Sequence, residues 1–263
     1  MLRFLLATAV LALASCAHAP TGAGDASRWW HARQMVVVTT GGWDDVHGQL
    51  RTFERTEGGA WREAAGSRPV VIGRTGAAWG IGLHDIPTDD GSAGDTGPIK
   101  REGDGRSPAG VFAIGEAFGY AATAATALPY AAMDASDYCI DVSGSPLYNR
   151  IVDAEDVGAD AVRESTEPMR RDLHADGDQR YRLGFVIEHN PRGKAMAGSC
   201  IFAHLWKSPD SATAGCTAMQ AETMQALLAW LDPKQQPVFV LLPQAEYLHL
   251  QHDWRLPALE PRA

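Results

Sequence analysis

Residues 35–42 read Met-Val-Val-Val-Thr-Thr-Gly-Gly, a run of β-branched side chains that ends in two glycines. β-Branched residues favour extended backbone, and paired glycines are typical of a turn. Residues 49–54 then alternate polar and apolar side chains, as a half-buried strand does. Gly58-Gly59 follows at about the distance of a hairpin turn. This part of the chain therefore predicts short strands joined by tight turns.

The same signals recur along the rest of the chain, while helical spacing is rare. Further strands are expected at residues 69–73, 110–114, 184–188, 199–206 and 237–242. A short helix is expected at residues 164–171, and a longer one at residues 221–231, where leucines recur at helical spacing before Pro233. We therefore predict a mainly β domain, a β-sandwich or β-barrel with a few short helices.

The composition is that of a globular chain with an acidic balance. Of 263 residues, 45% are apolar and 21% are charged, and the net charge is −9. Nucleic-acid-binding proteins normally carry a basic surface, so we expect no nucleic-acid partner. Four cysteines are too few for a disulfide-dense module, and no internal apolar run reaches the ~18 residues of a membrane span.

The first residues have the pattern of a targeting segment. Residues 1–15 combine a basic start, an apolar stretch and small residues, which predicts a secretory signal peptide. Residues 13–16, Leu-Ala-Ser-Cys, resemble a bacterial lipobox, which implies cleavage before Cys16 and a lipid on that cysteine. The alternative is a plain signal peptide that is cut after Ala17 or Ala19.

A lipid on Cys16 would anchor the protein to a membrane. We expect a periplasmic lipoprotein, and Ala17, where an Asp would favour retention in the inner membrane, favours the outer membrane. Residues 18–27 are small and polar, so we expect residues 16–30 to comprise the lipidated cysteine and a flexible tether. Residues 31–263 would then form the folded domain.

Candidate chemistry lies towards the C-terminal third of the chain. A predicted strand carries His204, and a short polar loop returns the chain to Thr213-Ala-Gly-Cys216. A cysteine beside a histidine has the parts of a thiolate nucleophile and its base. The imidazole can lower the pKa of the thiol or take its proton. We therefore predict that Cys216 and His204 form the reactive pair.

The helix after Cys216 has two candidate starts. Thr217 and Gln220 fit a capping box that would begin the helix at Ala218. Cys216 would then lie at the positive end of the helix dipole, which favours the thiolate. A start near Ala221 would give weaker support, and the sequence allows both.

Cys200 is the competing nucleophile, and strand geometry disfavours it. On a strand, Cys200 and His204 would be separated by roughly 13 Å, too far for a hydrogen bond. Cys200 is therefore expected to be buried or bonded to Cys139, since an oxidising compartment permits a disulfide. A zinc site using these cysteines lacks a C-x-x-C pair, so no metal is expected.

Two segments carry a resemblance to a known family. Residues 100–112 read Lys-Arg-Glu-Gly-Asp-Gly-Arg-Ser-Pro-Ala-Gly-Val-Phe, and residues 204–216 begin with His204 and end in Thr-Ala-Gly-Cys. Together they resemble the YkuD-type L,D-transpeptidase family, with its Gly…Thr-Pro-x-Gly-x-Phe strand entry and its His…Ser-His-Gly-Cys motif. Ser107 stands in the place of the Thr. With shorter pieces between these segments and around them, the resemblance covers about residues 35–245.

The resemblance implies a β-rich catalytic domain that acts on peptidoglycan stem peptides and needs no metal or organic cofactor. Cys216 would be the nucleophile and His204 the base. Backbone amides near Gly215 and Cys216 would form the oxyanion hole. A carbonyl of Gly198 or Ser199 would orient the imidazole.

The implied reaction is acyl transfer. Cys216 would attack the carbonyl of the third residue of a tetrapeptide stem and release the terminal D-alanine. Transfer of the acyl group to an amine of a second stem gives a 3–3 crosslink, and transfer to water gives carboxypeptidase activity. Ser199, Thr213 and Arg106 are the candidate contacts for the stem peptide.

Two departures from the family pattern keep other functions open. Ala214 stands in place of the usual second His, and Ala218 in place of the usual Arg, which removes a charged clamp for a carboxylate. Arg101, Arg106 and Lys207 are candidate substitutes. One alternative is a hydrolase of the same fold, either an L,D-carboxypeptidase or an enzyme that cuts a crosslink or releases an attached protein. The other is a non-enzymatic, wall-binding lipoprotein.

Overall fold

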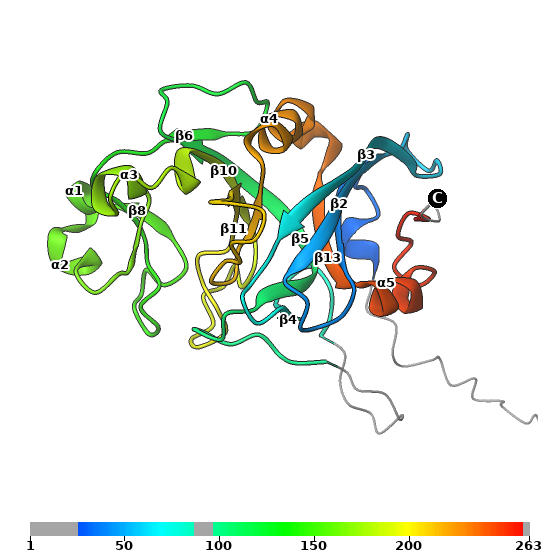
Figure 1. Cartoon of the computed structure of the whole chain (residues 1–263), viewed down its shortest axis with the longest axis horizontal. Helices are drawn as coiled ribbons and strands as arrows, with labels where there is room; N and C mark the ends of the chain where they lie inside the picture. Colours follow the sequence, from blue (N-terminus) through cyan, green and yellow to red (C-terminus); the bar gives the residue numbers. More distant parts are fainter. Residues whose placement is uncertain (1–25, 87–96, 260–263) are drawn as a thin grey trace, which may run out of the picture.

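The computed structural model describes residues 26–86 and 97–259 and places them in a β-barrel with a smaller lobe at one side (Figure 1). Eight strands follow one another in the order β10-β11-β12-β3-β2-β1-β13-β5, and β5 pairs with β10 to close the ring. The predicted mainly β fold with a few short helices is confirmed, with a closed barrel as its form. No helix within the described residues is long and apolar enough to cross a membrane.

Strand pairing in the barrel is mixed. The barrel strands are β1 (Gln34–Thr40), β2 (His47–Glu54), β3 (Arg62–Val71), β5 (Ser107–Gly119), β10 (Leu183–Ile187), β11 (Phe202–Leu205), β12 (Thr217–Met219) and β13 (Val238–Pro243). Two short strands, β4 (Ala77–Trp79) and β6 (Tyr130–Ala132), pair with β5 outside the ring. Most neighbours are antiparallel, but β1 pairs with β13, and β11 with β12, in parallel.

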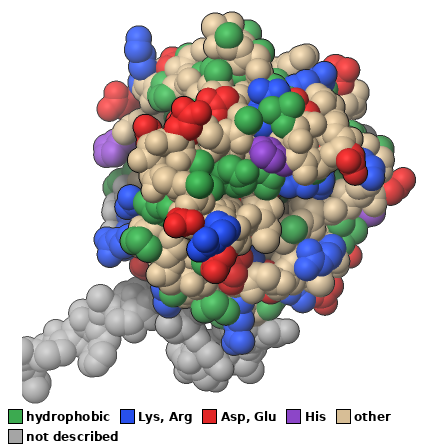
Figure 2. All heavy atoms as spheres, turned by 90° about the vertical axis from the view of Figure 1, so that its left-hand side faces the viewer, with side chains coloured by type: hydrophobic (Ala, Val, Ile, Leu, Met, Phe, Trp, Pro, Cys, Tyr) green, Lys and Arg blue, Asp and Glu red, His purple; other side chains and the backbone are tan. Residues whose placement is uncertain are grey.

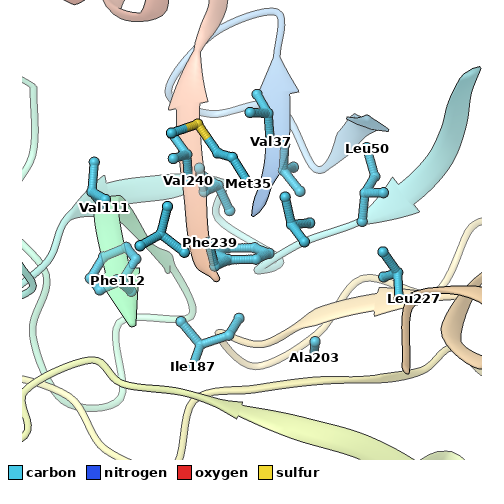
Figure 3. Close-up of a cluster of buried hydrophobic side chains, with 14 of the residues drawn as sticks. Met35, Val37, Leu50, Val111, Phe112, Ile187, Ala203, Leu227, Phe239 and Val240 are labelled. Atoms are coloured by element: carbon cyan, nitrogen blue, oxygen red, sulfur yellow. The ribbon is translucent and has the colours of Figure 1, made fainter. Parts of the chain in front are cut away.

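Apolar side chains from β1, β5 and β13 form one buried cluster (Figure 3), in which Phe239 pairs with Phe112 and Val240 with Val111 across β13 and β5. Strand β13 is buried along its whole length, and β1 almost so. Strands that are covered on both faces are apolar throughout rather than alternating, which explains the β-branched run in β1. Helix α4 (Ala221–Trp230) contributes Leu227 to the same cluster, while η1 (Ala26–Trp29), η3 (Pro233–Gln235) and α5 (Gln244–Leu250) complete the domain.

Residues 133–182 form the lobe at the left of Figure 1. They contain the three-stranded sheet β8-β7-β9 (Ile151–Asp153, Asp137–Cys139, Glu167–Pro168) and the short helices α1 (Ala154–Val157), α2 (Ala159–Val162), α3 (Arg171–His174) and η2 (Arg180–Arg182). A second apolar cluster joins Met169 and Tyr181 of the lobe to Phe118 and Phe202 of the barrel wall. The lobe therefore packs on the outer face of β11, because the intervening Ala203 faces the barrel core.

A disulfide between Cys139 of β7 and Cys200, just before β11, ties the lobe to the barrel. Of the two expectations for Cys200, burial or bonding to Cys139, the structure shows the bond, and Cys200 is also buried. The bridge removes both cysteines as free thiols. Cys216 is the free cysteine of the described residues.

Two predicted elements differ from the structure. The helix expected at residues 164–171 is wrong, because the Ser165 hydroxyl donates to the Cys139 carbonyl and Thr166 bonds Asp141, which holds this segment extended against β7. The strand expected at residues 199–206 begins only at Phe202. Before it, Cys200 has a left-handed backbone with φ 54°.

The N-terminal predictions are only partly open to test. The signal peptide 1–15 and the lipidated Cys16 lie outside the described residues. The end of the predicted tether, residues 16–30, belongs to the domain instead. Trp29 is 3% exposed, its indole N–H donates to the Trp254 carbonyl, and it packs in the barrel core because its ring area favours burial.

The disulfide predicts a measurable share of stability. Replacing both cysteines, Cys139→Ser with Cys200→Ser, should lower the free energy of unfolding by roughly 2–4 kcal/mol, because the bridge closes a long loop in the unfolded chain. Urea unfolding of the oxidised protein measures this difference. Wild type treated with a reductant should match the double variant, and equal midpoints for oxidised wild type and the variant would contradict the prediction.

Candidate functional site

Parallel pairing of β11 with β12 brings the two predicted reactive residues to one face. His204 of β11 lies in register with Ala218 of β12, and Cys216 comes two residues before Ala218. Paired residues of neighbouring strands share a face, and side chains two apart on a strand do as well. Cys216 and His204 therefore lie on the outer face of the barrel wall, beneath the lobe, where Cys216 joins the cluster of Tyr181 and the His204 ring contacts the Tyr181 ring.

The Cys216 thiol is buried between backbone groups of the preceding loop and strand. Its Sγ accepts the Phe202 N–H at 3.3 Å and lies 3.5 Å from the Cys200 carbonyl oxygen. Burial and then the nearby Glu167 carboxylate raise the pKa of Cys216 to about 12, although the Phe202 N–H opposes both. At neutral pH the resting cysteine is therefore a thiol, so catalysis would need a base.

His204 is suited to be that base. Its Nδ1 lies 2.7 Å from the Leu205 carbonyl oxygen. A carbonyl only accepts, so Nδ1 carries the proton and Nε2 is the acceptor. Burial, and then the positive charges of Arg180 and Arg171, lower the pKa of His204 to about 4, so the imidazole is neutral at neutral pH.

The group that orients His204 was not the predicted one. Leu205 supplies the carbonyl, whereas the Gly198 carbonyl accepts from the Asn190 side-chain amide. The expected role of Gly198 or Ser199 is therefore wrong, because the chain turns at Cys200 before β11 begins and their groups bond elsewhere. Within the described residues no hydrogen bond joins the His204 imidazole to the Cys216 sulfur, so direct proton transfer requires the two side chains to approach each other.

One of the two predicted oxyanion donors is free. The Gly215 N–H donates to Thr213 Oγ1 at 3.1 Å and is not available. The Cys216 N–H has no hydrogen-bond partner among the described residues. Gly215 serves another purpose, since a Cβ there would lie 3.0 Å from the Arg106 carbonyl oxygen, and only glycine allows this close approach without a shift.

Two hydroxyl groups hold the Cys216 backbone. Thr213 Oγ1 donates to the Cys216 carbonyl at 2.6 Å, and Ser107 Oγ donates to the same oxygen at 2.9 Å. Both lone pairs of that oxygen are thereby used. The two segments that carry the family resemblance thus meet at Cys216. Thr213, predicted as a contact for substrate, has its hydroxyl engaged with the Cys216 backbone.

The other two predicted substrate contacts also bond within the protein. The Arg106 guanidinium donates to the carbonyls of Trp43 and Ala77 and pairs with Asp44 at 2.7 Å. Ser199 Oγ donates to Glu102 at 2.8 Å. Neither side chain is directed to Cys216 by these bonds, and both hold loops around the barrel.

The helix dipole gives Cys216 little help. Residues 217–219 are strand β12, and helix α4 begins only at Ala221, the later of the two candidate starts. Gln220 is its N-cap and makes no side-chain cap bond, so the predicted Thr217–Gln220 capping box is wrong. Pairing of β12 between β11 and β3 holds this segment extended and overrides the local capping signal.

Three residues of the lobe complete the site, and no sequence motif marks them. Tyr181 is 5% exposed, with its ring centroid 5.1 Å from that of His204. Arg171 lies over the Tyr181 ring and pairs with Glu167 at 3.1 Å. The available signal was a tyrosine between two arginines directly before the strand that pairs with β11, which is too common a pattern to identify a site.

A hollow of about 830 Å³ opens beside His204, between the lobe, the end of β11 and the start of α4. Leu205 and Trp206 form part of its wall, and the exposed Arg182 and Lys207 line it without an ion pair in the described part of the chain. On the face of the molecule that carries the lobe, acidic and basic side chains are interspersed (Figure 2). Arg182 and Lys207 are therefore two positive charges of the hollow that no ion pair neutralises in the described residues.

Clusters of residues that could bind a metal ion are rare in the described part of the chain. Asp134, Asp137 and Asp153 form the one group there whose ligand atoms lie within 4.8 Å of one another. They lie on the lobe, and Asp134 already accepts hydrogen bonds from the backbone and hydroxyl of Ser136. Nothing links this group to the cysteine and histidine.

Comparisons of the chain with protein-family models, with curated proteins and with solved structures find no match. Its function is therefore inferred from the residues of the site and from the two motif segments. Those segments meet through Ser107 and Thr213 at Cys216.

The buried thiol predicts a steep pH dependence of its own reactivity. Because the thiolate reacts and the pKa of Cys216 is about 12, alkylation by iodoacetamide should rise about tenfold per pH unit from about pH 6 to about pH 9. Mass spectrometry of the Cys216 peptide measures the rate, with Cys216→Ala as the blank. A plateau within that range would show a thiolate that is already formed.

Loss of the Thr213 hydroxyl should loosen the nucleophile. Thr213→Val removes the donor to the Cys216 carbonyl and the acceptor for Gly215, so the free energy of unfolding should fall by about 1–3 kcal/mol. Thr213→Ser keeps the hydroxyl and should stay near wild type. Urea unfolding compares the two variants, and equal losses would contradict a role for the hydroxyl.

Proposed function

We propose that the protein is a cysteine acyltransferase of the YkuD L,D-transpeptidase type that acts on peptidoglycan stem peptides. The observation that carries the proposal is the Cys216–His204 pair on adjoining strands, with the imidazole tautomer fixed by the Leu205 carbonyl. The free Cys216 N–H supports it, since acyl transfer needs a donor for the oxyanion. We propose equally that Cys16 carries the lipid that holds the protein in the periplasm.

In the proposed reaction, His204 Nε2 takes the proton of Cys216 as the sulfur attacks the carbonyl carbon of the third stem residue. The Cys216 N–H donates to the oxyanion that forms. Collapse of this intermediate leaves a thioester on Cys216, and the departing D-alanine amine takes the proton from His204. An amine of a second stem then attacks the thioester, forms the 3–3 crosslink and releases the thiol.

The hollow beside His204 offers a place for an acidic end of the substrate. Ala218 lies in register with His204, so the position of the family's arginine holds only a methyl group. Arg182 and Lys207 line the hollow next to Leu205 and carry charges without partners in the described chain. Lys207 was one of the predicted substitutes for the missing arginine, whereas Arg106 is held by Asp44.

Ala218 at the position of the family's arginine keeps hydrolysis as the second candidate function. With a methyl group facing His204, no charged side chain at that position would hold the carboxylate of an acceptor stem. Water could then take the acyl group, as in an L,D-carboxypeptidase or an enzyme that cuts a crosslink or releases an attached protein.

Purified full-length protein in detergent, incubated with a disaccharide-tetrapeptide, tests the proposal. Mass spectrometry should show a dimer that has lost one D-alanine, and Cys216→Ala should give none. Tripeptide without dimer would establish the hydrolase instead. Unchanged substrate, together with unchanged crosslinked and protein-bound wall, would contradict both enzymatic functions and favour a wall-binding lipoprotein.

A further inference from the structure

Tyr181 is held rigidly above the reactive pair. It lies in η2, directly before β10, and its ring is packed against three other rings. Ring centroids lie 5.8 Å from Phe118, 5.5 Å from Phe202 and 5.1 Å from His204. A side chain fixed on so many sides presents its hydroxyl at a defined place.

That hydroxyl acts on two neighbouring groups. Tyr181 and Cys216 pack in one buried cluster, and hydrogen bonding from the phenol lowers the pKa of both the Glu167 carboxyl and the Cys216 thiol. A phenol has a single proton to donate, so it can serve only one of them at a time. Glu167 is also paired with Arg171 at 3.1 Å and therefore stays compensated when the phenol turns away.

The Cys216 thiolate has few other supports. The Phe202 N–H at 3.3 Å donates to the sulfur, and the buried Lys100 adds a positive charge that is shared with Asp104. Burial and the Glu167 carboxylate raise the pKa of Cys216 and so disfavour the thiolate. Helix α4 begins only at Ala221, too far along the chain for its dipole to stabilise the anion. A sulfur that must become an anion here needs a further donor.

We propose that Tyr181 is a catalytic residue whose hydroxyl turns its hydrogen bond from Glu167 to the Cys216 sulfur as the thiolate forms. The step moves no covalent bond of Tyr181, because His204 takes the thiol proton and the phenol only donates to the resulting anion. Charge-assisted bonds of this kind are stronger than neutral ones, so the donor stabilises the thiolate more than the thiol. The inference rests on Cys216 being the nucleophile of the proposed function.

Replacing Tyr181 and replacing Glu167 should then change the alkylation rate of Cys216 in opposite directions. Tyr181→Phe keeps the packed ring and removes the donor, so alkylation of Cys216 by iodoacetamide at neutral pH should slow by roughly tenfold, the effect of one pKa unit. Glu167→Gln removes a negative charge and leaves the phenol only a neutral, weaker acceptor to compete with the sulfur, so alkylation should become faster. Tyr120→Phe is the matched control, since its hydroxyl donates to Asp178 near the lobe surface, and it should react like wild type.

The opposite signs separate a chemical role from simple covering of the thiol. If Tyr181 only shielded Cys216, its replacement would expose the sulfur and speed alkylation, and that result would overturn the proposal. Thermal melting confirms that each variant is folded. If Tyr181→Phe does not fold, the test rests on the alkylation rate of Cys216 in Glu167→Gln. A rate equal to or below that of wild type overturns the proposal, and a higher rate supports it. Alkylation needs no cell-wall substrate, so failure of the proposed function leaves this test intact.

Discussion

Parallel pairing of the three-residue strand β12 with β11 fixes where the reactive groups lie. It sets His204 opposite Ala218 and leaves Cys216 at the strand's entry, beside the Phe202 N–H. Closure of the barrel depends on the same strand, because β12 joins β11 to β3. The hydroxyls of Ser107 and Thr213 then hold the Cys216 carbonyl, so barrel, motif segments and nucleophile form one connected unit.

The site is electrostatically unlike a preformed thiolate–imidazolium pair. Burial lowers the pKa of His204 to about 4 and raises that of Cys216 to about 12, so both groups rest neutral. Charge would appear only when a substrate approaches, and the donors for it are already placed. The lobe provides much of this environment, because it carries Glu167, Arg171 and Tyr181 and is tied to the barrel by the Cys139–Cys200 bridge.

Local patterns predicted the elements that depend on local physics. The β-branched run of β1, the alternating strand β2 and helix α4 are where local patterns placed them, because burial follows side-chain spacing. The predicted helix at residues 164–171 failed where Ser165 bonds a strand distant in sequence. The capping box at Thr217 failed for the same reason, since strand pairing in the ring outweighs a local cap.

The sequence by itself determined the mainly β class and indicated Cys216 and His204 as the candidate pair, because both signals are encoded in short segments. It left open the partner of Cys200, the start of α4 and the group that orients His204. Only the tertiary structure decided these, and it shows that the side chains of Thr213, Arg106 and Ser199 bond within the protein. Tyr181 and Glu167 belong to a lobe whose contact with β11 depends on packing across the chain, which no local spacing specifies.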